Sequence, residues 1–139
     1  SQFELASERI AVPLDSGDPE DEHSCFSDNT HNDFLYNVLG IENVYFGRYE
    51  NYFVSGIGDL VEKIDPKLNQ RMLEALAQTK SLVKKVRAPF DRVLVSPAGS
   101  LERTNAELVV DALMRQAALI KEIGARLGLT VNVNDGEAG

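Results

Sequence analysis

The sequence contains a single cysteine, Cys25, among its 139 residues. A lone cysteine cannot form an internal disulfide, and it cannot supply the ligand set of a zinc finger. The sequence also lacks an apolar run long enough to cross a membrane, and no basic, apolar leader is visible at its start. Because the chain begins with Ser1 and a helix without a cap, we interpret it as a processed product or a fragment.

Positive charge is scarce in the first part of the chain. The net charge is −8, and residues 1–35 hold nine acidic side chains against Arg9 alone, so that acidic and basic groups cancel over the remainder. A nucleic-acid surface needs the opposite sign, and we therefore expect no nucleic-acid partner. The negative excess is suited to attracting cations. Alternatively, it belongs to a solvated acidic loop.

The composition that remains is that of an ordinary folded domain, with 43% apolar and 26% charged residues. Residues 3–12 carry apolar groups at helical spacing, and we expect this helix to end at Pro13, since a proline disfavours helix in the residue before it. Residues 13–28 include Gly17 and Pro19, and they predict an acidic loop.

A second helix is expected directly after this loop. Asp28 is a suitable N-cap, because its carboxylate can accept from the free N–H groups of the first turn. Apolar residues at helical spacing follow as far as Gly40, which is expected to close or kink the helix. Residues 41–53 are expected to continue as helix or irregular structure. Their aromatic side chains are expected to pack in the core or as a lid, with a stacking platform as the alternative.

Two longer helices have clear boundary signals. Asp65 and Pro66 predict the cap and first turn of a helix over residues 66–86. Thr104 and Glu107 form a capping-box pattern at the start of the last helix, for which Gly128 is the expected stop.

The remaining segments are a connection over residues 88–103 and a frayed tail over 130–139. Several helices, each with one apolar stripe, bury those stripes most simply against one another. We therefore predict an all-α fold, with a single helical domain over residues 1–139 built as a four-helix-bundle-like module.

The segment DPEDEHSCFSDNTHND, residues 18–33, concentrates acidic groups, both histidines and the cysteine. A calcium loop beginning at Asp15 is excluded, because its twelfth residue would be Phe26 rather than glutamate. No HExxH metallopeptidase motif is present. No sequence feature places a base and an orienting group around Cys25, so a cysteine nucleophile is not favoured.

Metal binding and solvation remain alternatives for this segment. Glu20, Asp21, Glu22 and His23 offer oxygen and nitrogen ligands that suit iron, zinc or manganese. Consecutive residues cannot all point one way, so at most two or three of them can converge. In the alternative, Asp28 caps the following helix and the acidic groups face water.

The stretches EDEHSCFSDNTHND and LGIENVYFGRY resemble the imelysin-like family of bacteria, which includes imelysin peptidases and iron-regulated proteins. The resemblance is specific over residues 20–48 and extends more loosely to the final helix, where it ends in Leu127-Gly128-Leu129. It implies two helical-bundle halves with a functional site near their interface. The family motif Gly-x-His-x-x-Glu is absent here, so the chain resembles the C-terminal half, and its expected partner is the N-terminal half that carries the motif.

The resemblance implies a set of ligand-binding candidates within the acidic segment, with His31 the weakest of them: Glu20, Asp21, Glu22, His23, Ser24, Asp28 and His31. It implies a protein of the bacterial periplasm or outer membrane, linked to iron uptake, that binds a metal such as iron or zinc or a small ligand between the two halves. The alternatives are a metallopeptidase of the insulin-cleaving imelysin type and a structural helical module. No residue is assigned a catalytic role.

Overall fold

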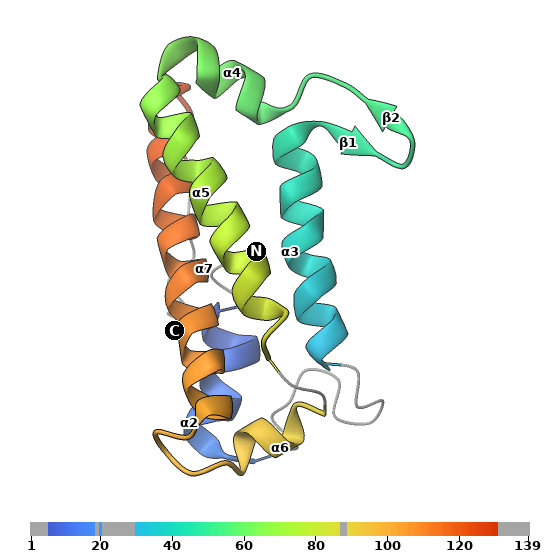
Figure 1. Ribbon diagram of the computed structural model, residues 1–139. Coiled ribbons are helices and arrows are strands. Elements are labelled where there is room, and N and C mark those ends of the chain that lie inside the picture. Colours follow the sequence, from blue (N-terminus) through green and yellow to red (C-terminus); the bar gives the residue numbers. More distant parts are fainter. Residues whose placement is uncertain (1–5, 19, 21–29, 87–88, 131–139) are drawn as a thin grey trace.

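The computed structural model describes residues 6–18, 20, 30–86 and 89–130, and it is all-α apart from a small hairpin (Figure 1). The predicted fold class is confirmed. Three long helices form the body, with a short helix and the hairpin at one end and another short helix at the other (Figure 1). The elements in chain order are η1 (Ser7–Ala11), α2 (Val12–Ser16), α3 (Thr30–Phe46), β1 (Arg48–Tyr49), β2 (Tyr52–Phe53), α4 (Ile57–Ile64), α5 (Pro66–Val83), α6 (Asp91–Leu94) and α7 (Leu101–Arg126).

The first helix continues past the proline at which it was predicted to end. The π-helical turn η1 leads directly into α2, where Pro13 is buried in the first turn. Pro13 has no N–H to donate to the preceding turn, and it lies directly after the π-helical turn, where the regular α-helical hydrogen-bond pattern is already interrupted. The helix ends instead at Ser16, followed by Gly17 in the left-handed conformation at φ 64°. The predicted acidic loop therefore begins at Gly17 rather than at Pro13.

α3 begins at Thr30 and runs through Gly40 to Phe46 without a break. Its predicted cap, Asp28, lies outside the described residues. Gly40 neither closes nor interrupts the helix. It lies at an exposed position, and a Cβ atom built there would meet nothing within 4 Å.

A hairpin follows α3, and the sequence did not predict it. β1 and β2 pair antiparallel, with Arg48 opposite Phe53. The neck of this hairpin is a close backbone crossing, where a Cβ atom on Gly56 would lie 2.3 Å from the carbonyl oxygen of Tyr45. Gly47, on the other side of the neck, has φ 67° and would be equally obstructed. Glycine is therefore required on both sides of the crossing.

The aromatic residues of this region divide between the core and the surface. Tyr45, in the last turns of α3, is buried. Tyr49, Tyr52 and Phe53 in the hairpin are exposed, and the Phe53 side chain has 80% of its surface accessible. The expectation that they pack in the core is wrong for these three, because a two-residue hairpin that projects from the body has no second layer to cover it.

α5 begins where the sequence predicted but ends at Val83 rather than at residue 86, and α7 begins earlier than predicted. The Asp65 carboxylate accepts a hydrogen bond from the Leu68 N–H at 3.1 Å and caps α5. At α7 the cap is Ser100, whose hydroxyl accepts from the Arg103 N–H at 3.3 Å. Thr104 was the predicted cap, but its N–H donates to the Ser100 carbonyl at 2.9 Å, so it already lies within the helix.

α5 and α7 form the most extensive helix pair, and a buried polar group lies between them. Gln116 of α7 is almost fully buried, and its side-chain amide donates to the Ala75 carbonyl oxygen at 3.0 Å and to the Thr79 hydroxyl. The Thr79 hydroxyl in turn donates to the same carbonyl at 2.9 Å. Because these contacts span both helices, they fix how α7 is placed along α5.

One core lies at the α6 end of the body, and we call it the α6-end core. The connection before α7 contributes to it through α6, and Phe34 and Phe90 meet edge-to-face with their ring centres 4.9 Å apart. The first helix also packs here, and Arg103 donates to the Leu14 carbonyl oxygen. The buried members of this core are Ala6, Ile10, Leu14, Phe34, Val38, Leu82, Val83, Phe90, Val93, Leu94, Ala106, Val109, Ala112 and Leu113.

A second core, the α4-end core, lies at the opposite end of the body. Its buried members are Tyr45, Val61, Leu68, Met72, Leu76, Leu119 and Ile123. They come from α3, α4, α5 and α7. Among the described residues, none from η1 or α2 belongs to this core. Within the described ranges, the first helix therefore covers one half of the body, and no equivalent helix covers the other half.

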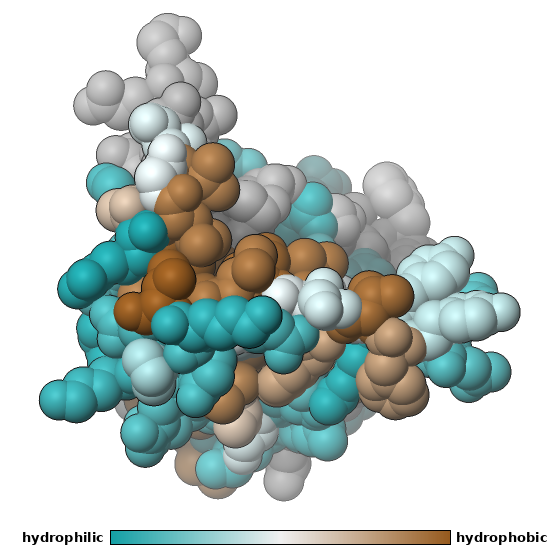
Figure 2. All heavy atoms as spheres, turned by 90° about the horizontal axis from the view of Figure 1, so that it is seen from above, coloured by the Kyte–Doolittle hydropathy of each residue, from teal (hydrophilic) through white to brown (hydrophobic). Residues whose placement is uncertain are grey.

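The α4 end also carries apolar side chains on its surface. Figure 2 looks onto this end and shows apolar residues in a band across the face, with polar residues on either side. Exposed members of this region are Phe53, Val54, Ile57, Leu60 and Ile64. Within the described part of the chain, no helix combines the length and the apolar character that crossing a membrane requires.

The neck of the hairpin provides a test of the fold. We expect Gly56→Ala to lower the free energy of unfolding by about 1–3 kcal/mol, because its Cβ would overlap backbone atoms that cannot move aside. Gly40→Ala is the matched control, and it should raise the free energy by up to about 1 kcal/mol, since alanine favours helix at an open position. Urea denaturation of both variants measures the difference. Equal shifts in the two midpoints would contradict the close crossing.

Candidate functional site

The structure describes two of the predicted ligand-binding residues. Glu20 lies on the surface after α2, and His31 is the second residue of α3. The other candidates lie outside the described residues, so their roles stay predictions: Asp21, Glu22, His23, Ser24 and Asp28. Glu20 and His31 thus mark the two ends of the acidic segment.

Local hydrogen bonds shape the chain where it enters this segment. The Asp18 N–H donates to the Ser16 hydroxyl at 3.2 Å, and the Glu20 N–H donates to the Asp18 carboxylate at 2.9 Å. Such bonds between a short polar side chain and the backbone two residues on are typical of turns that follow a helix. The Asp18 carboxylate therefore has a structural role here, whereas the exposed Glu20 carboxylate is available to a ligand.

His31 has an unusual environment at the start of α3. Its side chain is partly buried, and its Nδ1 atom is enclosed without a hydrogen-bond partner among the described residues. The preceding residue, Thr30, is fully buried, so this end of α3 is held inside the body. A buried ring nitrogen without a partner loses the hydrogen bond that water would give it. His31 was the weakest candidate from the sequence, and it has the clearest structural sign of a missing partner.

A metal site is not assembled by the described residues alone. Among them, no group of three His, Cys, Asp or Glu side chains comes together. Most of the predicted ligands lie outside this part of the chain, so the metal prediction remains open. The metallopeptidase alternative likewise gains no support from the described residues.

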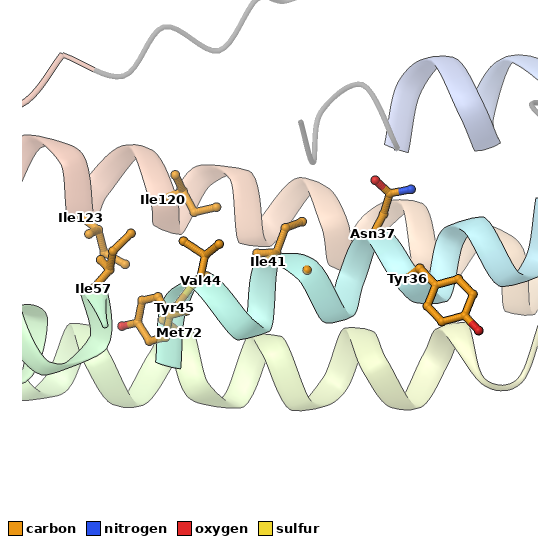
Figure 3. Close-up of a pocket in the computed structure, with 10 residues that line it drawn as sticks. Tyr36, Asn37, Ile41, Val44, Tyr45, Ile57, Met72, Ile120 and Ile123 are labelled. Carbon is orange, nitrogen blue, oxygen red and sulfur yellow. The ribbon is translucent and has the colours of Figure 1, made fainter. Parts of the chain in front are cut away.

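A groove of about 670 Å³ lies at the α4 end. Its lining comes from α3, α4, α5 and α7, and Figure 3 shows Asn37, Ile41 and Val44 directed to the same side of α3. The groove is mainly apolar. The lining residues are Tyr36, Asn37, Gly40, Ile41, Val44, Tyr45, Ile57, Met72, Ile120 and Ile123.

A buried chain of hydrogen bonds supports one end of the groove. The Tyr45 hydroxyl donates to Asn69 Oδ1 at 2.7 Å, and Asn69 Nδ2 donates to Glu62 Oε2 at 2.7 Å. Burial raises the pKa of the Tyr45 phenol to about 12, and the nearby negative charge of Glu62 adds to the shift. Tyr45 is therefore a neutral donor at ordinary pH, and it ties α3 to α4 and α5.

Sequence reasoning did not find the groove. Ile41, Val44 and Ile120 lie at spacings that also fit an ordinary core stripe, so their pattern alone cannot show that they face an open surface. The available signal was Gly40, a helix-weakening residue in the middle of an otherwise regular helical pattern.

Comparison with known proteins agrees with the resemblance seen in residues 20–48. The sequence model of the family described as Imelysin matches residues 3–120 of this chain. The chain belongs to the imelysin family. A relative of this imelysin chain is "Iron-regulated protein A" of Synechococcus elongatus, which is 27% identical over 114 residues, or 81% of this chain.

The imelysin chain spans 32% of the length of that relative. The family match includes the acidic segment, α3, the hairpin, α4, α5, α6 and most of α7. It therefore covers both the candidate ligand-binding residues and the groove, and neither feature belongs to a part of the chain foreign to the family.

The Tyr45 hydrogen-bond chain generates a pH-dependent prediction. The folded protein holds the Tyr45 proton more tightly than the unfolded chain, in which a tyrosine has its ordinary pKa near 10. The contribution of Tyr45 to stability is therefore fully present below about pH 10 and is lost as the pH rises towards 12. An ultraviolet titration of tyrosinate in the folded protein should show one late-titrating group, Tyr45, at a pKa of about 12.

Tyr45→Phe is the matched variant for this titration. It should remove the late group and lower the free energy of unfolding by about 1–3 kcal/mol, because the Asn69 amide oxygen loses its buried donor. Tyr52→Phe, on the exposed hairpin, should leave both the late group and the stability unchanged. A wild-type titration that shows no late group would contradict the buried hydrogen bond.

Proposed function

We propose that this imelysin-family chain is part of a bacterial envelope protein linked to iron uptake, and that it binds a metal ion or a small ligand. The link to iron is supported by its similarity to a protein named as iron-regulated. Within the chain, we assign the binding role to residues 20–31, where Glu20, Asp21, Glu22, His23, Ser24, Asp28 and His31 are the candidates. The envelope location is part of the same proposal.

The observation that carries this proposal is the enclosed Nδ1 atom of His31, which lacks a hydrogen-bond partner among the described residues. Buried polar atoms in folded proteins nearly always have a partner, so an exception calls for an explanation. A neutral imidazole nitrogen can accept a hydrogen bond or bind a metal ion. A ligand held at the start of α3 would supply what His31 lacks.

The charge around His31 favours a cation. Nine acidic side chains lie in residues 1–35 against a single basic one. Their combined field raises the local concentration of positively charged ligands. Carboxylate oxygens and imidazole nitrogens together suit iron, zinc and manganese, with iron favoured by the named relative.

A complete site needs groups from outside this chain. Neighbouring residues of the segment cannot all point at one ligand, so the chain supplies at most a few of the four to six ligands that such metals take. The chain covers about a third of the length of its relative. We therefore propose that the N-terminal half of the same protein, carrying Gly-x-His-x-x-Glu, completes the site.

A metal titration of the whole protein tests this proposal. Calorimetric titration with Fe, Zn and Mn should give the tightest binding for one of them, and both His23→Ala and His31→Ala should weaken it by at least about tenfold, equivalent to about 1.4 kcal/mol. Glu74→Ala is the control, since Glu74 lies on α5 and its carboxylate pairs with Gln70 at 3.0 Å. Circular dichroism confirms that each variant is folded.

Two results would overturn the proposal. One is the absence of binding of all three metals by the whole protein. The other is binding that is as tight in both histidine variants as in wild type, which would place the metal elsewhere.

A further inference from the structure

The groove at the α4 end is a continuation of the surface against which the first helix packs. In the α6-end core, the first helix packs against α7 and α6. Its residues Ala6 and Ile10 belong to one buried cluster with Val38 of α3 and Leu113 of α7. Within the described part of the chain this layer ends at Ala6, while α3 and α7 extend further. Figure 3 shows the first helix on the side of α3 to which Asn37, Ile41 and Val44 point.

The apolar stripes that receive the first helix also continue into the groove. On α3, the buried Phe34 and Val38 are followed at helical spacing by Ile41, and on α7 the buried Val109 and Leu113 are followed by Ile120. Residues three and four apart lie on one face of a helix. One face of α3 and one face of α7 thus contribute both to the α6-end core and to the groove.

Gly40 and Val44 show that the described residues leave the groove at the α4 end uncovered. Val44 has 64% of its surface exposed, although it belongs to the apolar lining. A glycine within a helix costs about 1 kcal/mol relative to alanine, and nothing within 4 Å of Gly40 accounts for that cost. A glycine at such a position permits the close approach of another backbone.

The direction and length of the first helix identify what fills the groove. Its C-terminal end is fixed beside the start of α7, where Arg103 donates to the Leu14 carbonyl oxygen, so its N-terminal end points towards the α4 end. The distance along α7 from Leu113 to Ile123 corresponds to about 15 Å at about 1.5 Å per residue. About ten helical residues preceding Ala6 would span it.

We propose that the groove binds a helix formed by the polypeptide that directly precedes Ala6, as a continuation of the first helix. The sequence pattern supports this occupant, since Phe3 precedes Ala6 by three residues and Ile10 follows by four. The relative is about two and a half times as long as this chain, so that family member has further polypeptide available for the purpose. The inference does not depend on the proposed metal site, which lies at the other end of α3.

Thiol labelling of the whole protein tests the inference. In a Cys25→Ser background, Val44→Cys places a thiol in the groove and Val95→Cys places one at the α6 end, and these two valines have 64% and 69% of their surface exposed. We expect the thiol at position 44 to react with a maleimide at least about tenfold more slowly than the thiol at position 95. Gly40→Phe, which fills the groove, should abolish this protection.

A substitution in the proposed occupant identifies the segment. Phe3→Asp should bring the labelling rate at position 44 close to that at position 95, whereas Ser1→Asp, with the same added charge on another side of the helix, should leave it slow. Equal labelling at the two positions in the otherwise unchanged protein would overturn the inference. So would protection that survives Phe3→Asp, because another segment would then fill the groove.

Two further controls separate other occupants. Protection that disappears on dilution would indicate a second copy of the protein. Protection that disappears after unfolding, extraction with organic solvent and refolding would indicate a bound lipid. Either result would overturn the assignment of the groove to the segment before Ala6.

Discussion

The contact between α5 and α7 is the constraint on which the rest of the structure depends. It carries apolar packing in both cores and, between them, the buried hydrogen bonds of Gln116 to Ala75 and Thr79. A buried polar group is satisfied in only one relative placement of two helices, so these bonds fix the register of the pair. α3, α4 and the first helix then pack against a frame that is already set.

The two ends of the body differ in how completely the described helices enclose the core. At the α6 end, the first helix, α3, α5, α6 and α7 enclose a continuous core. At the α4 end, the Tyr45–Asn69–Glu62 hydrogen bonds tie α3 to α4 and α5, but the side between α3 and α7 remains a groove. The chain belongs to the imelysin family and spans 32% of the length of a family member. This short span offers an explanation for two features, the groove and the His31 nitrogen that has no partner among the described residues. Our two proposals are that other parts of a larger protein cover the groove and complete the site at the His31 nitrogen.

The sequence predicted those features that depend on neighbouring residues. Asp65 caps α5 as expected, and Gly128 follows α7 in the left-handed conformation at φ 73°. Pro13 was misinterpreted as a stop because nothing in the local pattern announces a π-helical turn before it. The hairpin was missed because it depends on a crossing between Gly47 and Gly56, nine residues apart. In the candidate site, residue types and family resemblance selected residues 20–31, but the enclosure of the His31 nitrogen depends on tertiary packing that no spacing reveals.

Amide hydrogen exchange along α3 tests most directly the central claim that one half of the body is closed within this chain and the other half is closed by further polypeptide. The measurement compares residues 31–38 with residues 39–46 in this 139-residue chain and in the whole protein. The account predicts that the second half of α3 exchanges faster than the first in the 139-residue chain, and that only the second half becomes markedly slower in the whole protein. Equal protection of both halves in the 139-residue chain, unchanged in the whole protein, would contradict it.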